Sequence, residues 1–137
     1  MRGLKGEQVL MRIHCGERDR HAGRPLYEEI VRLLRARGYA GATVFRGVMG
    51  FGAAGHVASE RMEIISHDLP LVIECVETSE RIEAILPEID AMMDAGLITL
   101  ERAKVILYRP KREGESDQSA LPDEHRIDIT GDWRTEQ

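Results

Sequence analysis

The order in which two hydrophobic periodicities follow one another is the feature of this chain that most limits its fold. Apolar residues alternate with polar ones in some segments, as in strands, and recur at helical spacing in two longer segments. Strands are predicted at residues 9–15, 42–51, 71–76 and 104–108, and helices between Pro25 and Gly38 and between Thr78 and Gly96. This βαββαβ order predicts a ferredoxin-like α+β domain, with a four-stranded antiparallel sheet and two helices on one of its faces.

Apolar residues occupy both sides of the predicted strands. In the third strand, Val72 and Val76 lie on one side, and Leu71, Ile73 and Cys75 lie on the other. The helices cover only one face of the sheet, and monomeric proteins rarely expose large apolar patches. We therefore expect copies of the chain to cover the second face, and three copies packed around an axis meet this requirement.

The composition changes after Pro110. Residues 111–137 carry four basic and eight acidic side chains, which account for −4 of the net charge of −5. The chain is predicted to divide into a folded domain at residues 1–110 and an acidic tail at residues 111–137. The tail is either flexible or docked on a neighbour through Trp133.

Charge and composition limit the classes of partner and the location. A net charge of −5 offers no basic stripe for a duplex, and 4% aromatic residues offer no base-stacking platform, so no nucleic acid is expected. No apolar run reaches the roughly 18 residues that a membrane span needs. Arg2, Lys5 and Glu7 interrupt any signal-peptide core. A cytoplasmic protein is predicted.

Glycines gather directly after the predicted second strand. Gly47, Gly50 and Gly52 lie between Arg46 and Arg61. Closely spaced glycines allow backbone N–H groups to surround a phosphate, and arginines donate paired hydrogen bonds to it. The same glycines fit a twisted hairpin that needs positive φ. Because the pattern is neither a dinucleotide-binding GxGxxG nor a Walker loop, the residues alone favour the hairpin but leave the phosphate site open.

A longer segment around these glycines resembles a known family. Residues 41–52, with the sequence GATVFRGVMGFG, are similar to the signature of the DUF190 family, whose members resemble PII signalling proteins. The resemblance extends over residues 4–108. Further matching motifs are Gly16-Glu17 with Asp19, residues 24–27 and residues 68–74.

The resemblance implies a PII-like trimer that binds an adenine nucleotide (AMP, ADP or ATP) in clefts between subunits. It therefore favours the phosphate site over the hairpin, and it places the turn at residues 38–43 near the adenine. Phe51 is expected either on the adenine ring or in the core, and His56 at the phosphate. The nucleotide-binding residues that we expect are Thr43, Arg46, Gly47, Met49, Gly50, Phe51, Gly52, His56, Arg61 and Lys104.

The resemblance also implies regulation rather than catalysis. PII relatives sense nucleotides and signal to transporters or enzymes by moving a loop, and the partner implied here is a membrane ion transporter or channel. The corresponding loop, residues 53–61, is shorter than that of PII proteins and has no tyrosine. A covalent switch of the PII type is therefore not expected.

Two other functions stay open. A CutA-like trimer shares this fold and binds metal through His and Cys, and a nucleotide hydrolase would use the glycine segment. Cys15 and Cys75 lie in apolar runs and are interpreted as buried, reduced thiols. Adjacent residues on a strand point to opposite faces, so Cys15 has no base in its neighbour, and we expect no enzyme. No metal is expected either, because no compact ligand set is formed by His14, Glu17, Asp19 and His21.

Overall fold

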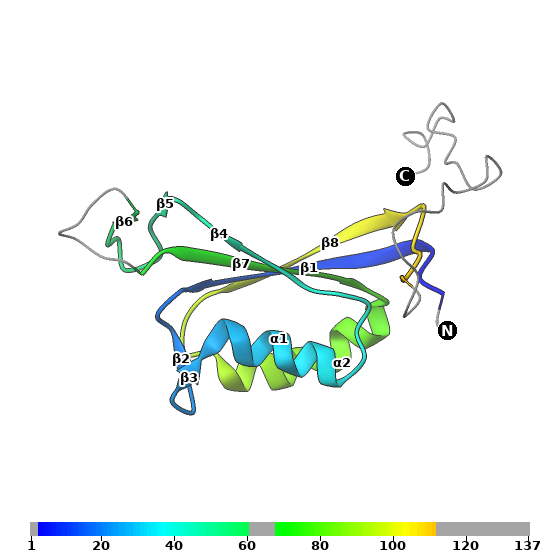
Figure 1. The fold of residues 1–137 in the computed structure, drawn as a ribbon, viewed down its shortest axis with the longest axis horizontal. Coiled ribbons are helices and arrows are strands. Elements are labelled where there is room, and N and C mark those ends of the chain that lie inside the picture. Colours follow the sequence, from blue (N-terminus) through cyan, green and yellow to red (C-terminus); the bar gives the residue numbers. More distant parts are fainter. Residues whose placement is uncertain (1–2, 61–67, 112–137) are drawn as a thin grey trace.

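The centre of the protein is a four-stranded antiparallel sheet, seen in a computed structural model that describes residues 3–60 and 68–111. The strands β1 (Gly6–Gly16), β4 (Thr43–Arg46), β7 (Pro70–Glu77) and β8 (Leu97–Val105) lie in the order β4-β7-β1-β8. The helices α1 (Leu26–Ala36) and α2 (Ser79–Met92) both lie on one face of this sheet (Figure 1). The predicted ferredoxin-like βαββαβ fold is confirmed.

Two short strand pairs interrupt the simple order. β2 (Arg20–His21) pairs with β3 (Arg24–Pro25) between β1 and α1. β5 (Met49–Gly50) pairs with β6 (Ala58–Ser59), and this pair continues beyond one end of the sheet (Figure 1). The single strand predicted at residues 42–51 is therefore wrong in detail, because it divides into β4 and β5. Arg61 lies outside the described residues, and so does the acidic tail after Lys111.

The fourth strand begins earlier than predicted. It spans Leu97–Val105 rather than residues 104–108. Ile98 is paired with Ile13 and faces the helices, whereas the next residue, Thr99, is paired with Arg12 on the other face. The strand lies at an edge of the sheet and carries charged residues, so its apolar alternation is weaker than that of a central strand.

The predicted helix ends at Pro25, Gly38 and Thr78 are confirmed, and α1 begins directly after Pro25. Gly38 adopts a φ of +69° and donates to the Arg35 carbonyl at 3.0 Å, which closes α1 as predicted. Thr78 caps α2 by accepting the Arg81 N–H at 3.4 Å. The α2 helix ends at Met92, short of Gly96. Among the described residues, no helix is long and apolar enough to cross a membrane.

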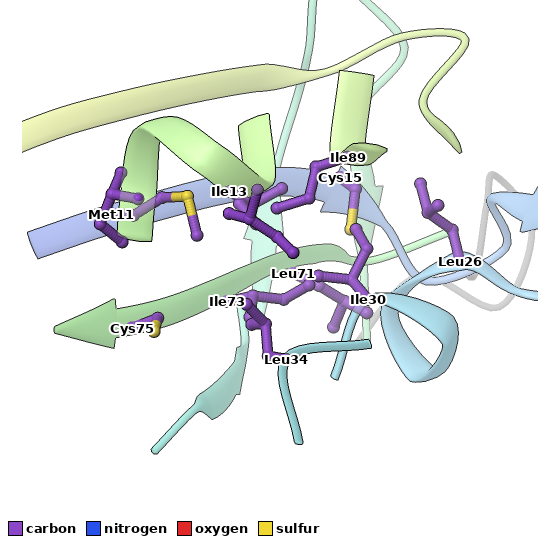
Figure 2. Packing of buried hydrophobic residues seen from close by; sticks show 12 residues of the cluster. Met11, Ile13, Cys15, Leu26, Ile30, Leu34, Leu71, Ile73, Cys75 and Ile89 are labelled. Carbon is purple, nitrogen blue, oxygen red and sulfur yellow. The ribbon is translucent and has the colours of Figure 1, made fainter. Parts of the chain in front are cut away.

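The core lies between the helices and the sheet (Figure 2). Its two cysteines, Cys15 and Cys75, are buried, which confirms their interpretation as core residues. Aliphatic side chains supply nearly all of the rest, so the core depends on shape-matched packing with few aromatic rings. The buried cluster consists of Met11, Ile13, Cys15, Leu26, Ile30, Leu34, Leu71, Ile73, Cys75, Ile82, Ile85 and Ile89.

The second face of the sheet, here called the open face, is mixed rather than wholly apolar. The register places the half-buried Val72 and Val76 on it, as predicted. Arg12 lies on the same face, in the central strand β1, and forms ion pairs with Glu74 and Glu101, each at 2.8 Å. The hydrogen bond to Glu74 and the charge of Glu101 raise the pKa of Arg12, which therefore stays charged.

Candidate functional site

The predicted site residues lie in three places. Thr43 begins β4, and Lys104 lies near the end of β8. The register pairs Arg46 with Leu71 at one end of the sheet and Lys104 with Glu7 at the other, roughly 25 Å apart at about 3.3 Å per residue. One subunit therefore does not bring Lys104 to the glycine segment. The remaining described candidates follow β4 at its far end: Gly47, Met49, Gly50, Phe51, Gly52 and His56.

Two of the glycines have a structural reason to be glycine. The Gly47 N–H donates to the Pro70 carbonyl at 2.7 Å. A Cβ atom at Gly47 would lie 2.7 Å from Pro70 Cγ, and one at Gly50 would lie 3.0 Å from it. Gly52 differs, since a Cβ atom there would meet nothing within 4 Å. Gly47 and Gly50 thus have a structural role through close approach to Pro70, not through the positive φ that the hairpin interpretation expected, and Gly52 leaves open space beside the backbone.

Arg46 is the residue before the glycine segment, and its side chain contacts the turn that follows β1. Its Nη2 is 2.7 Å from Oε1 of Glu17, and its side chain is 60% exposed. The turn that carries Glu17 is held by Asp68, which accepts the Arg18 N–H at 2.8 Å. An exposed guanidinium has five donors, so one ion pair leaves it able to bind an anion.

The segment around β5 presents apolar side chains to solvent. Phe51 is 75% exposed, so it does not belong to the core. Phe45, Val48 and Met49 are also exposed and precede it in the chain. Phe45 lies on β4 opposite Val72, on the open face, and we call the other three residues, Val48, Met49 and Phe51, the apolar arm. Single exposed apolar residues are ordinary, but three in one short segment are typical of a binding surface.

A pocket beside the start of β4 was only partly anticipated. The turn at residues 38–43 was expected near the adenine, and Thr43 was predicted at the site. The other walls come from β1, β7 and the segment after β8, which periodicity alone does not bring together. The pocket has a volume of about 340 Å³ and is lined by Leu4, Leu10, Ala40, Gly41, Ala42, Thr43, Glu74, Cys75, Val76 and Tyr108.

The described residues contain no group of three or more His, Cys, Asp or Glu side chains that could hold a metal ion. Burial raises the pKa of the Cys15 thiol to about 11, and the charges of Asp19 and Asp68 add to the effect. A thiol with so high a pKa is neither a good nucleophile nor a ready metal ligand.

Comparison with known proteins identifies the family. Residues 8–105 match the DUF190 family model, described as Uncharacterized ACR, COG1993. The chain belongs to the DUF190 family. The resemblance of residues 41–52 to the DUF190 signature is thereby confirmed.

Relatives of this DUF190 protein cover most of its described domain. A UPF0166 protein of Aquifex aeolicus (strain VF5) is 35% identical over 100 residues, which are 73% of this chain and 94% of the relative. A UPF0166 protein of Methanocaldococcus jannaschii is 35% identical over 92 residues, which are 66% of this chain and 84% of the relative.

Two solved structures of CPII, a nitrogen regulatory PII-like protein from Thiomonas intermedia K12, are also similar. The structure bound to ADP, AMP and bicarbonate has a TM-score of 0.49 and 17% identity, covering 72% of this chain and 88% of that chain. The structure bound to ADP and bicarbonate has a TM-score of 0.46 and 18% identity, with the same coverage of both chains.

The contact between the glycines and Pro70 predicts different outcomes for two substitutions. Gly47→Ala places a methyl group against Pro70 and should lower the free energy of unfolding by about 1–3 kcal/mol. Gly52→Ala, the matched control in open space, should change it by less than about 0.5 kcal/mol. Urea unfolding at equal protein concentration measures both. Equal stability of the two variants would contradict a structural role of Gly47 at its contact with Pro70.

The raised pKa of Cys15 predicts a pH-dependent stability. Folding favours the neutral thiol, so this contribution is present below the ordinary thiol pKa of 9.0 and is lost as pH rises towards about 11. The stability difference between wild type and Cys15→Ala should therefore shrink by about 1–2 kcal/mol over that range. Chemical unfolding at the two pH values measures it. A constant difference would show that the Cys15 thiol ionises normally in the folded protein.

Proposed function

We propose that this DUF190 protein is a homotrimeric PII-like regulatory protein that binds an adenine nucleotide between subunits and signals to a partner protein. The observation that carries the proposal is the position of the pocket at Thr43. It opens on the face of the sheet that the helices leave uncovered, beside the segment whose sequence resembles the DUF190 signature.

The chemistry of the pocket suits an adenine ring. Leu10 and Val76 supply apolar contacts for the flat faces of a planar heterocycle. The Glu74 carboxylate accepts hydrogen bonds and is able to take one from an exocyclic amine, as is the Thr43 hydroxyl. Glu74 already accepts from Arg12, which orients its carboxylate at the pocket.

The charged candidates indicate why a neighbouring subunit is needed. Arg46 is about 10 Å further along β4 than Thr43, a span similar to that between the base and the phosphates of a nucleotide. The register, however, places Thr43 and Arg46 on opposite faces of the sheet, and Lys104 lies at the far end. A neighbour that contributes its own cation would complete the site at a cleft between subunits.

The open face suits burial against other copies of the chain. Leu10, Val72 and Val76 on this face are half-buried already, and Arg12 is neutralised within its own subunit. Covering a charge costs much less when it is already paired and hydrogen-bonded. Three copies packed through this face would remove its apolar side chains from water.

The apolar arm is the surface that we assign to a partner protein. Its residues Val48, Met49 and Phe51 are exposed, and the β5-β6 pair that includes Met49 extends beyond the end of the sheet (Figure 1). The resemblance to PII proteins implies a membrane ion transporter or channel as this partner. We propose binding without catalysis, since the buried Cys15 has a pKa too high for a nucleophile at neutral pH.

Assembly through the open face predicts a measurable mass. Light scattering should give about three times 15.5 kDa for the wild type. Val72→Asp places an unpaired charge on the open face and should yield a smaller species. Ala84→Asp, on the exposed side of α2, is the matched control and should leave the mass unchanged. A wild-type monomer at micromolar concentration would refute the trimer.

The role of Arg46 predicts a loss of affinity. Calorimetric titration of AMP, ADP and ATP should detect binding to the wild type. Arg46→Ala should weaken it by about 1.5–3 kcal/mol, the range for a hydrogen bond to a charged group. Arg32→Ala, which removes an exposed arginine from α1, is the control and should bind as the wild type does.

Rising salt should weaken nucleotide binding to the wild type, because part of the attraction is a screened charge interaction. Unchanged affinity in Arg46→Ala would remove Arg46 from the site. Failure of the wild type to bind any of the three nucleotides would refute the proposed ligand.

A further inference from the structure

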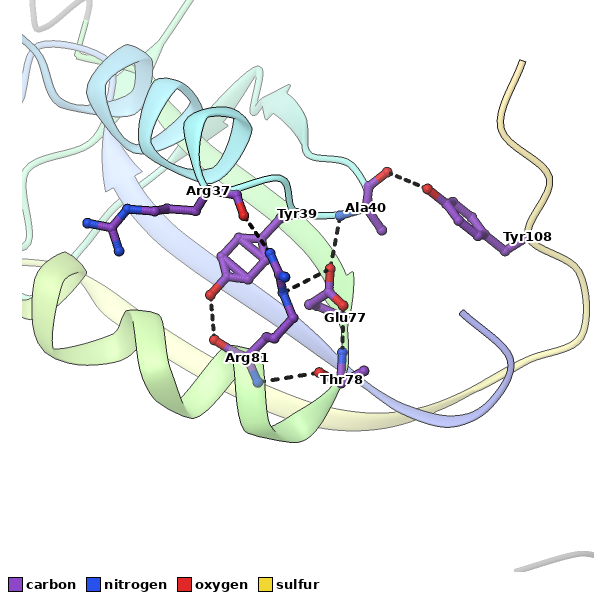
Figure 3. A network of polar contacts seen from close by, with 7 residues as sticks. All are labelled: Arg37, Tyr39, Ala40, Glu77, Thr78, Arg81 and Tyr108. Carbon is purple, nitrogen blue, oxygen red and sulfur yellow. Dashed lines mark hydrogen bonds and ion pairs between the residues drawn. The ribbon is translucent and has the colours of Figure 1, made fainter. Parts of the chain in front are cut away.

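One residue of the pocket wall, Ala40, is held through its backbone from two directions. The Ala40 N–H donates to Oε2 of Glu77 at 2.9 Å, and the Ala40 carbonyl accepts the Tyr108 hydroxyl at 3.3 Å. Figure 3 shows Ala40 between the two side chains, which come from β7 and from the segment after β8. Ala40 begins the run of four residues, 40–43, that forms one side of the pocket.

The hold from Glu77 is firm. Its side chain is 0% exposed, and its second carboxylate oxygen accepts the Thr78 N–H at 3.1 Å. Arg81 lies 3.8 Å from the same carboxylate and donates to the Arg37 carbonyl at 2.6 Å. The Arg81 guanidinium also stacks on the ring of Tyr39, 4.4 Å from its centroid. This inner network fixes the position of the Ala40 N–H group.

The hold from Tyr108 is weaker and is accessible to solvent. Tyr108 is 37% exposed and follows the last residue of β8 by three positions, outside the sheet. Its link to Ala40 is a single neutral hydrogen bond of 3.3 Å. The ring itself is part of the pocket lining. The segment after β8 is thus joined to the Ala40 carbonyl by a hydrogen bond at the protein surface.

We propose that Tyr108 is a positioning residue for the nucleotide pocket: its hydroxyl fixes the Ala40 carbonyl and thereby keeps residues 40–43 in the conformation that accepts the ligand. The inference rests on the proposed function for the identity of the ligand. Because binding and wall position are linked, a bound ligand should in turn stabilise the docked position of Tyr108.

The test compares Tyr108→Phe with Tyr27→Phe. The first change removes the hydroxyl and keeps the ring in the pocket. The second removes a hydroxyl from α1 and serves as the matched control. The Tyr27 hydroxyl donates to Oε1 of the neighbouring Glu28 at 3.4 Å. ADP affinity is measured by calorimetry. Hydrogen exchange is measured without ligand at the amides of Tyr39 and Ala40, which are hydrogen-bonded in the wall.

The positioning role predicts that Tyr108→Phe binds ADP about 2- to 10-fold more weakly, the factor for one neutral hydrogen bond. Exchange at Tyr39 and Ala40 should accelerate by a similar factor, while the melting temperature stays within about 2 °C of the wild type. Tyr27→Phe should alter neither quantity. Unchanged affinity and exchange in Tyr108→Phe would overturn the inference.

Two other outcomes separate this inference from the proposed function. Weaker binding with unchanged exchange would mean that the hydroxyl contacts the ligand directly, which overturns the positioning role. If the wild type binds no adenine nucleotide, the proposed ligand fails, and the exchange measurement alone decides. Faster exchange at Ala40 in Tyr108→Phe would then still support the hold on the pocket wall, and unchanged exchange would refute it.

Discussion

The buried carboxylate of Glu77 is the interaction on which the geometry around the pocket depends. A charge removed from water is tolerated only when its oxygen atoms are hydrogen-bonded or paired. The N–H donors here come from the turn after α1 and from the start of α2, and Arg81 lies 3.8 Å away as an ion-pair partner. Satisfying one carboxylate therefore fixes the end of β7, the start of α2 and the chain leading to β4 relative to one another. Apolar packing alone specifies such a relation less sharply, because side chains of similar volume can be exchanged.

The two faces of the sheet are stabilised in different ways. On the helix face, aliphatic side chains such as Ile13 and Ile73 pack closely, and the buried Glu77 at its end is hydrogen-bonded. On the open face, Arg12 is surrounded by two carboxylates and by half-buried apolar neighbours. The first arrangement holds a single chain together. The second is suited to a face that meets another chain, where a charge pair fixes orientation and apolar area supplies the attraction.

Much of the fold was predictable because it depends on local patterns. The alternation around Ile13 predicts β1, and Gly38 predicts the end of α1 through its freedom to adopt positive φ. The start of β8 was missed because the charged residues Glu101 and Arg102 interrupt its apolar pattern, as is common in an edge strand. Residues 42–51 read as one strand because nothing in the segment itself reveals that Pro70 packs against Gly47.

The site was harder to predict than the fold, because it is built from contacts between distant segments. Thr43 and the turn at residues 38–43 were assigned from a family resemblance, and residues 40–43 of this segment line a pocket. Tyr108 and Glu77 were not, since both act on the backbone of Ala40, and a backbone amide has no sequence signature. Whether Phe51 belongs to the core also depends on the path of the arm, which glycine-rich sequence leaves undetermined.

The edges of the sheet have a consequence for solubility. Within one subunit, β8 is an edge strand whose backbone groups are open to pairing with a strand from any chain. Its residues Glu101, Arg102 and Lys104 are exposed charges of both signs. An incoming strand would have to desolvate these charges and match them in register. The opposite edge, β4, is only four residues long and ends at Arg46. The sheet thus resists growing into a fibril by strand addition, while its broad face stays available for association.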